Sequence, residues 1–342
     1  MTSYFIRRFL LIIPTFFGIT IITFLILQIV PGGPLEMEIM KIRMGSGKQS
    51  ESGSISGSSQ NIPQAALDEL TKFYGFDKPI HERYFLWLSN LAKLNLGRSY
   101  VYGEPVLDVI TARFPISIYF GMVGFILTYI ICVPLGVYKA VKNGSTFDFI
   151  TSALVFIGYS VPGFALGAVL LVLFGGGSFW DVFPLGGFRS DGWEDLSLGS
   201  KIWDQIHHTF LPVACYMIGN FAFLTVLTKN TVIDNLSQDY VRTAFSKGIS
   251  ERKVIFGHAL RNSLIPVSTG LGNNIALILA GSVLIEKVFN INGMGLLGYT
   301  SIVQRDYPVV MGILVITTIL LLLGNIISDM IYAFVDPRIR FN

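Results

Sequence analysis

Histidine and cysteine, the side chains that most often bind metals or act as nucleophiles, are scarce in this sequence and widely separated. Of the four histidines, only His207 and His208 are adjacent, and no acidic or cysteine residue completes a zinc-ligand spacing around them. His81 is followed by a glutamate, but no second histidine completes the HExxH pattern of metalloproteases. Cys132 and Cys215 both lie inside apolar runs, where cysteine usually serves as a small apolar residue. The sequence predicts no metal site and no catalytic residue.

A glycine-rich phosphate loop is not predicted either. The run Gly175-Gly176-Gly177 ends an apolar segment, no Lys-Ser/Thr pair follows it, and the pattern GxxxxGK[ST] is absent from the chain. The serine-hydrolase pattern GxSxG does not occur in any apolar segment. An ATP-driven process would therefore need a separate ATPase polypeptide, and this chain is expected to bind no cofactor itself.

A few polar residues interrupt the apolar segments, and each of them has two possible roles. Asp329, one turn after Asn325, is either a transport residue or a carboxylate paired locally near the membrane interface, and its position near the end of its segment favours the second. Asn273, Asn274 and Ser282 either line a translocation path or form hydrogen bonds between membrane helices.

These residues lie in a chain whose composition is that of an α-helical membrane protein. Of its 342 residues 52% are hydrophobic and only 14% charged, its mean hydropathy is +0.60, and it has no basic block that would indicate nucleic-acid binding. A membrane-spanning helix needs about 20 mostly apolar residues. Six segments meet that length: 9–30, 114–138, 149–174, 209–228, 266–286 and 309–335. Prolines inside them are expected to mark kinks.

The distribution of basic residues predicts the orientation. Arg7 and Arg8 precede the first apolar run, which is too long for the core of a signal peptide and is read as a retained span, residues 1–30. Lysine and arginine then gather on one side of the six spans, which places both termini in the cytoplasm. The opposite side receives an insert, 31–113, in which 45–60 is expected to be a flexible Gly/Ser-rich loop and the part from Pro63 onward an ordered, partly helical region on the membrane surface.

The remaining residues, 114–342, form a five-helix core whose largest cytoplasmic segment is 229–265. Its pattern predicts two helices joined at a hinge: Gly248 suits the left-handed residue that ends a helix, Ser250 can cap the next helix, and Glu251 suits that helix's positive end. Two helices projecting from a membrane indicate a docking surface for a partner. A solvated basic connector that obeys the charge bias is the alternative.

The run from Tyr240 to Gly248 resembles the "EAA" loop of ABC-importer permeases, in which E-A-A and three further residues precede a glycine. Arg242, Thr243 and Ala244 occupy the first three places, and arginine in place of the glutamate resembles the peptide and nickel branch of that family. Further stretches resemble the oligopeptide/dipeptide permeases, and TKN, HERY and the Gly/Ser-bearing insert resemble the Yej-type branch, whose members import peptides including microcin C. The stretches are YGFDKPIHERY (74–84), LNLGRSY (94–100), TKN (228–230), HALRNSLIPV (258–267), NGMGLLGY (292–299), RDYP (305–308) and VDPRI (335–339).

This resemblance implies a type I ABC-importer permease of the bacterial inner membrane that moves peptides inward. It implies a second homologous permease, ATP-binding-cassette subunits that bind ATP and Mg²⁺ beneath the coupling loop, a periplasmic peptide-binding protein above, and surrounding membrane lipid. Contacts made by the missing glutamate cannot be transferred to Arg242. The residues expected to form the ATPase-docking surface are Tyr240, Val241, Arg242, Thr243, Ala244, Lys247, Gly248, Ser250 and Glu251.

Two other functions compete with this one. A secondary transporter or channel would carry its own energy coupling, usually through ionisable groups at mid-depth, and the spans are almost free of such groups. An intramembrane enzyme would need a catalytic motif, and the predicted spans contain neither HExxH nor GxSxG. Neither alternative explains the large cytoplasmic segment.

Overall fold

The computed structural model describes residues 2–29, 33, 35–36, 39–40, 64–73, 75–177, 179–269 and 281–335. The described chain is helical, apart from two isolated bridges between Arg98 and Pro105 and between Gly175 and Phe183. It divides into two compact units, one formed by Met1–Leu10, Arg113–Leu297 and Thr317–Asn342, and the other by Leu11–Ala112 and Gly298–Ile316. The prediction of an all-α protein is confirmed.

Four helices of the described chain are long and apolar enough to cross a membrane: Ile6–Ile29, Val106–Val141, Leu198–Leu236 and Tyr307–Met330. A fifth span results if the bent pair α7 (Thr146–Ser160) and α8 (Gly163–Phe174) is counted as one. These agree with five of the six predicted segments. The other predicted span, 266–286, falls mostly on 270–280, outside the described residues.

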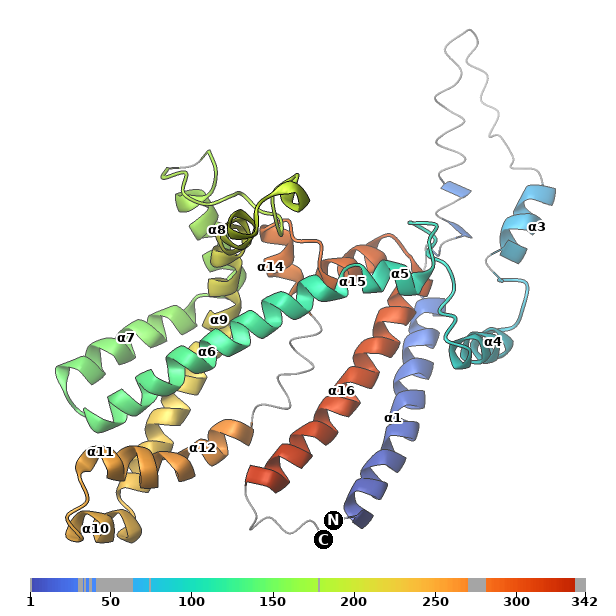
Figure 1. Ribbon diagram of the computed structural model, residues 1–342. Helices are drawn as coiled ribbons and strands as arrows, with labels where there is room; N and C mark the ends of the chain where they lie inside the picture. The colour runs from blue at the N-terminus through green and yellow to red at the C-terminus, as the bar shows by residue number, and fades with distance from the viewer. Residues whose placement is uncertain are drawn as a thin grey trace. The chain divides into compact units, whose positions relative to one another are not determined.

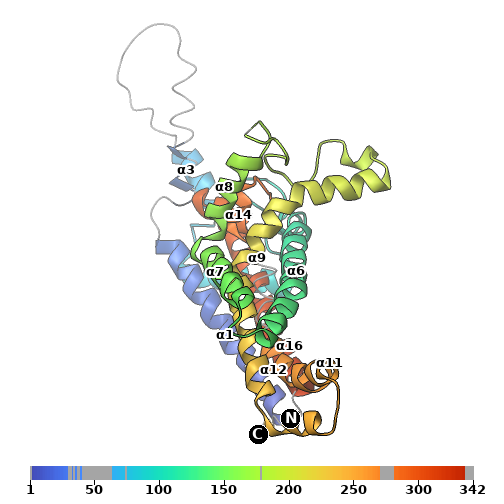
Figure 2. The same ribbon diagram turned by 90° about the vertical axis from the view of Figure 1, so that its left-hand side faces the viewer.

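The segment predicted as one span at 149–174 is broken. α7 and α8 meet at an angle of 96°, with Val161 and Pro162 between them. Proline has no N–H to donate and disfavours helical geometry in the residue before it, so α7 ends there and Pro162 caps α8. The predicted kink is confirmed at Pro162. α9, which contains Pro212, stays one helix but is bent between its first turns and the part beside α6 (Figure 2), and Pro14 and Pro134 also lie inside continuous helices.

The larger unit is organised around the long helix α9 (Leu198–Leu236). Its 39 residues correspond to about 58 Å, roughly twice the hydrocarbon thickness of a bilayer, so it extends well beyond the predicted span 209–228. α6 (Phe114–Val141) packs along α9, and α8 packs on it as well (Figures 1 and 2). The apolar centre of this unit includes Phe120, Cys215 and Phe289.

Glycines allow the close approach of these helices to α9. A Cβ on Gly136 of α6 would lie 2.6 Å from the Cβ of Thr228 and 2.8 Å from the carbonyl oxygen of Thr225. In α8, Gly163 and Gly167 form a GxxxG pattern, and a Cβ on Gly163 would lie 2.7 Å from the carbonyl oxygen of Cys215. Small residues at such spacing are the usual means by which membrane helices pack closely.

The smaller unit contains most of the described insert. Its helices are α1 (Thr2–Ile29) from Leu11 onward, α3 (Gln64–Phe73), α4 (Ile80–Ala92), α5 (Val106–Thr111), and the parts of α15 (Met294–Val303) and α16 (Tyr307–Val335) that belong to it. Tyr84 of α4 packs with Phe24 of α1 and Met311 of α16, and the hydroxyls of Tyr84 and Thr20 lie 3.0 Å apart. The prediction of an ordered, partly helical region after Pro63 is confirmed, whereas 45–60 lies outside the described residues.

Candidate functional site

The segment predicted to dock a partner begins on α9 itself. α9 ends at Leu236, and a short break leads into α10 (Asp239–Ser246). After Gly248 the chain continues as α11 (Glu251–Lys253), the π-helical stretch η2 (Val254–Ala259) and α12 (Leu260–Thr269). α10 and α11 lie at the same end of α9 (Figures 1 and 2). The predicted pair of helices with a hinge is confirmed.

The hinge has the geometry of a left-handed helix end. Gly248 has a φ of +74°, its N–H donates to the carbonyl of Phe245, and the N–H of Ile249 donates to the carbonyl of Ala244. Ile249 also packs in the same apolar cluster as Ala244. These two hydrogen bonds and the apolar contact make a Schellman motif, which ends α10 and turns the chain toward α11.

α10 has one face buried in its own unit and one face exposed. Val241 and Ala244 are buried against Val254 and Ala259, so these two predicted docking residues hold the helix in place rather than face outward. The other predicted docking residues are exposed: Tyr240, Arg242, Thr243, Lys247, Gly248, Ser250 and Glu251. Ser250 stands before α11 in the capping position, but its side chain accepts no capping hydrogen bond.

Two exposed aromatic side chains were not among the predicted docking residues. Phe245 is 44% exposed and Phe256 of η2 is 56% exposed. Large exposed aromatics are typical anchors in protein interfaces. The signal in the sequence was their position within the docking segment. Phe256 lines an apolar pocket with Pro134 and Tyr138 of α6, so it is not assigned to the same surface as α10. We define the coupling face as the exposed side chains of Tyr240, Arg242, Thr243, Phe245 and Lys247.

The segment that bears the coupling face is anchored to the helices above it. Ile255 of η2 packs with Val137 of α6 and Val232 of α9, and all three side chains are buried. The hydroxyl of Ser263 on α12 donates to the carbonyl of Thr231, at 3.1 Å. The segment that bears the coupling face is therefore joined to α6 and α9 through packed side chains and one hydrogen bond.

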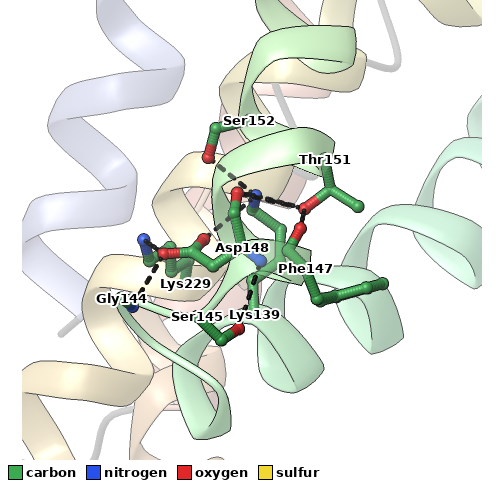
Figure 3. A network of polar contacts seen from close by, with 8 residues as sticks. All are labelled: Lys139, Gly144, Ser145, Phe147, Asp148, Thr151, Ser152 and Lys229. Atoms are coloured by element: carbon green, nitrogen blue, oxygen red, sulfur yellow. Dashed lines mark hydrogen bonds and ion pairs between the residues drawn. The ribbon is translucent and has the colours of Figure 1, made fainter.

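A buried ionic network joins three helices close to this anchor (Figure 3). The Asp148 carboxylate, in the first turn of α7, lies 2.7 Å from the Lys229 ammonium of α9 and 3.1 Å from the Lys139 ammonium of α6. The Lys139 side chain is 1% exposed, and its ammonium also donates to the hydroxyls of Thr151 and Ser152 and to the carbonyl of Asp148. The sequence indicated these lysines only as part of the basic bias.

A second buried carboxylate accepts hydrogen bonds from neutral donors of the described residues. Glu286 is fully buried in α14 (Val283–Val288). Its Oε1 accepts from the hydroxyls of Ser117 and Tyr216 and from the N–H of Ser282, and its Oε2 accepts from the N–H of Leu296 at 2.7 Å. The network fixes the loop that contains the predicted motif NGMGLLGY.

Of the residues predicted to line a path, Ser282 is partly buried, and its N–H also donates to the hydroxyl of Tyr216. Asn273 and Asn274 lie outside the described residues. Asp329 is buried and forms an ion pair of 3.0 Å with Arg8, so it has a charged partner, although one that lies far away in the sequence rather than in its own segment.

The adjacent histidines belong to a polar cluster of the larger unit. His208 lies 3.6 Å from the Asp204 carboxylate and 3.0 Å from the Ser190 hydroxyl, and His207 contacts the carbonyl of Val182. Within the described ranges, no three histidine, cysteine or acidic residues come together as metal ligands would.

Long apolar helices packed through glycines, with a short helical segment at one end of α9, are the architecture of an α-helical membrane protein. The chain belongs to the family described as "Binding-protein-dependent transport system inner membrane component", which matches residues 132–341. It is a non-catalytic permease subunit of the ABC-importer class, as the resemblance implied.

Similar proteins cover the whole chain, including the insert. The chain is 42% identical to "Inner membrane ABC transporter permease protein YejB" of Escherichia coli O157:H7 and to "Peptidoglycan transport system permease protein YejB" of Agrobacterium fabrum, over 100% of this chain and 99% of each relative. It is 36% identical to "Oligopeptide transport system permease protein AppB" of Bacillus subtilis, over 100% of both chains. The resemblance to the oligopeptide/dipeptide permeases and their Yej-type branch is confirmed.

Proposed function

We propose that this chain is one of two permease subunits that carry peptides from the periplasm into the cytoplasm, and that ATPase subunits drive it by pressing on the coupling face. The observation that carries the proposal is that α10 has one buried and one exposed side. Val241 and Ala244 pack it against Val254 and Ala259 of the same unit, while its opposite side is exposed. The names of the relatives support a peptide or a peptidoglycan fragment as cargo. Microcin C-like oligopeptides belong to the same chemical class.

The mechanism that follows is a rigid-body movement of packed helices between two conformational states. ATP binding would close the ATPase pair and move the coupling face, and the contacts of η2 with α6 and α9 would pass that movement to the spans. A loaded periplasmic binding protein would favour the state that receives the peptide. In this arrangement the chain lies in the bacterial inner membrane with both termini in the cytoplasm.

The test is reconstitution into liposomes with a labelled oligopeptide as cargo. The chain should copurify with a second permease and with ATPase subunits. The assembled complex should accumulate peptide only with ATP, Mg²⁺ and the binding protein. Transport by this chain alone, driven by an ion gradient, would instead identify a secondary transporter. A parallel assay with a muropeptide in place of the oligopeptide separates the two kinds of cargo named for the relatives.

A further inference from the structure

The smaller unit contains a cavity that the proposed transport function does not use. It has a volume of about 580 Å³, within the range of roughly 300–1,000 Å³ that is usual for small-ligand sites. It lies among the end of α1, the helices and loops of the insert and the start of α16, and all its lining residues belong to this one unit.

One wall of the cavity is apolar and comes from helices that are long enough to span a membrane. Phe24 and Leu27 lie near the end of α1, and Met311 lies in the first turns of α16. Trp87 of α4 continues this wall into the insert. Tryptophan is enriched where a protein crosses from the hydrocarbon to the headgroup region. The cavity therefore lies where two spanning helices end, at the depth of lipid headgroups.

The remaining lining carries an excess of positive charge. Lys72, Lys78, Arg83 and Arg98 contribute four cations and Asp77 one anion, which leaves a net charge of +3. Fixed cations beside an apolar wall favour a ligand that is anionic at one end and apolar at the other.

Arg83 is the cation most enclosed by the insert. Its guanidinium carbon lies 4.2 Å from the centre of the Phe76 ring, and its side chain is partly buried. Burial lowers the pKa of Arg83 from its ordinary value, because the charged form loses hydration there. The Asp77 carboxylate attracts Arg83 and offsets part of this loss, but among the residues that the structure describes it forms no ion pair with Arg83. An anion beside Arg83 would therefore offset the loss of hydration.

We propose that this cavity binds one anionic phospholipid, with its phosphate beside Arg83 and Lys78 and its acyl chains along Phe24, Leu27 and Met311. A small soluble anion would make no use of the apolar wall. An acidic protein surface would meet the exposed lysines but not the apolar residues contributed by the spanning helices. The phospholipid is the ligand whose two ends match both parts of the cavity.

The experiment measures lipid retention by the purified importer complex with native mass spectrometry. The probes are phosphatidylglycerol and phosphatidylcholine with identical acyl chains, and glycerol 3-phosphate serves as a soluble competitor. The wild-type complex should retain phosphatidylglycerol at least tenfold better than phosphatidylcholine. Glycerol 3-phosphate should not displace the lipid at equal concentration.

Variants then locate the site. Arg83→Gln and Lys78→Gln should each lower phosphatidylglycerol binding about fivefold, since one basic residue at a membrane surface contributes about that factor. Arg83→Lys keeps the charge and should retain most of the binding. Lys93→Gln removes the same charge at the end of the same helix, outside the cavity, and should leave binding unchanged.

Three results would overturn the proposal. The first is equal retention of the two lipids by the wild-type complex, a comparison that does not depend on the folding of any variant. The second is an equal loss of binding in Lys93→Gln and Arg83→Gln, which would indicate a general charge effect. The third is displacement by glycerol 3-phosphate, or binding only of an acidic partner protein, either of which would assign the cavity to another ligand.

Discussion

Asp306 accepts a hydrogen bond from the hydroxyl of Ser99, at 2.5 Å, across 207 residues of sequence. The same carboxylate accepts from the N–H groups of Tyr100 and Val101, so one buried side chain closes a turn of the insert. This joins two of the family-like stretches, LNLGRSY and RDYP, which are far apart in the sequence. The insert is therefore fixed to the loop that leads into α16.

Replacement of Asp306 should destabilise the smaller unit. Asp306→Ala removes the acceptor for three donors and should lower the free energy of unfolding by about 2–4 kcal/mol, because buried donors are left without partners. Ser99→Ala removes the hydrogen bond to Asp306 and the acceptor for the N–H of Tyr102 at 2.8 Å, and should cost about 1–2 kcal/mol. Thermal unfolding of the purified chain, with limited proteolysis of the insert, measures both. Equal melting temperatures for Asp306→Ala and the wild type would contradict this role.

The Asp148 network should behave as a buried charge system. Asp148→Ala leaves the Lys139 ammonium buried without an anion and should cost about 3–5 kcal/mol. Lys229→Gln should cost less, since the Lys229 side chain is 17% exposed and Lys139 still neutralises Asp148. Melting of the purified chain gives the order of the two variants. The double variant Lys139→Met/Asp148→Asn should lose less stability than the sum of the losses of its two single variants. A loss equal to that sum would exclude a direct interaction between Lys139 and Asp148.

The packing of α6 against α9 can be tested with two glycines. Gly136→Ala should cost about 1–3 kcal/mol, because its Cβ would lie 2.8 Å from a backbone oxygen of α9 that cannot move aside easily. Gly219→Ala, on α9 with no atom within 4 Å of the added Cβ, is the matched control and should raise stability by up to about 1 kcal/mol, because alanine is the better helix former. A larger loss of stability for Gly219→Ala than for Gly136→Ala would contradict the assignment of Gly136 to the close contact between α6 and α9.

Gly248 should be required for coupling rather than for membrane insertion. No atom lies within 4 Å of a Cβ added there, so the penalty for a side chain comes from the φ of +74°. Gly248→Leu should leave the chain in the membrane but abolish peptide uptake and peptide-stimulated ATP hydrolysis. Gly248→Asn should retain more activity, because asparagine enters the left-handed region more readily. Normal uptake by Gly248→Leu would count against docking at this hinge.

Glu286 offers a test in which size is held constant. A glutamine side chain at this position would present an NH₂ group where the carboxylate accepts on both oxygens, so donors would face donors. Glu286→Gln should therefore cost about 2–3 kcal/mol in the melting assay despite its equal volume. Ser117→Ala removes a weak donor to Glu286 at 3.3 Å and also the acceptor for the N–H of Met294 at 2.8 Å, so it should cost about 1–2 kcal/mol. If Glu286→Gln left the stability unchanged, Glu286 would have to be protonated in the folded protein.

The sequence predicted the features that depend on local pattern. Apolar length located five described spans, and the need for a left-handed residue located the hinge at Gly248. It did not predict which residues would meet across long separations, such as Asp148 with Lys229, 81 residues apart. Val241 and Ala244 were predicted to dock a partner although their i, i+3 spacing favours one shared apolar face of the helix, and that face is the buried one.

The π-helical stretch at Val254–Ala259 has a geometric consequence. A π-helical turn bonds residue i to residue i+5, so it contains an additional residue compared with an α-helical turn. Each residue of an α-helix rotates the chain by about 100°. Loss of one residue here would therefore turn α12 by that angle and carry the Ser263 hydroxyl away from the Thr231 carbonyl. The additional residue in η2 therefore sets the rotation of α12 about its axis relative to α11. The main effect of a deletion there would be to rotate α12, and the accompanying shortening would matter less.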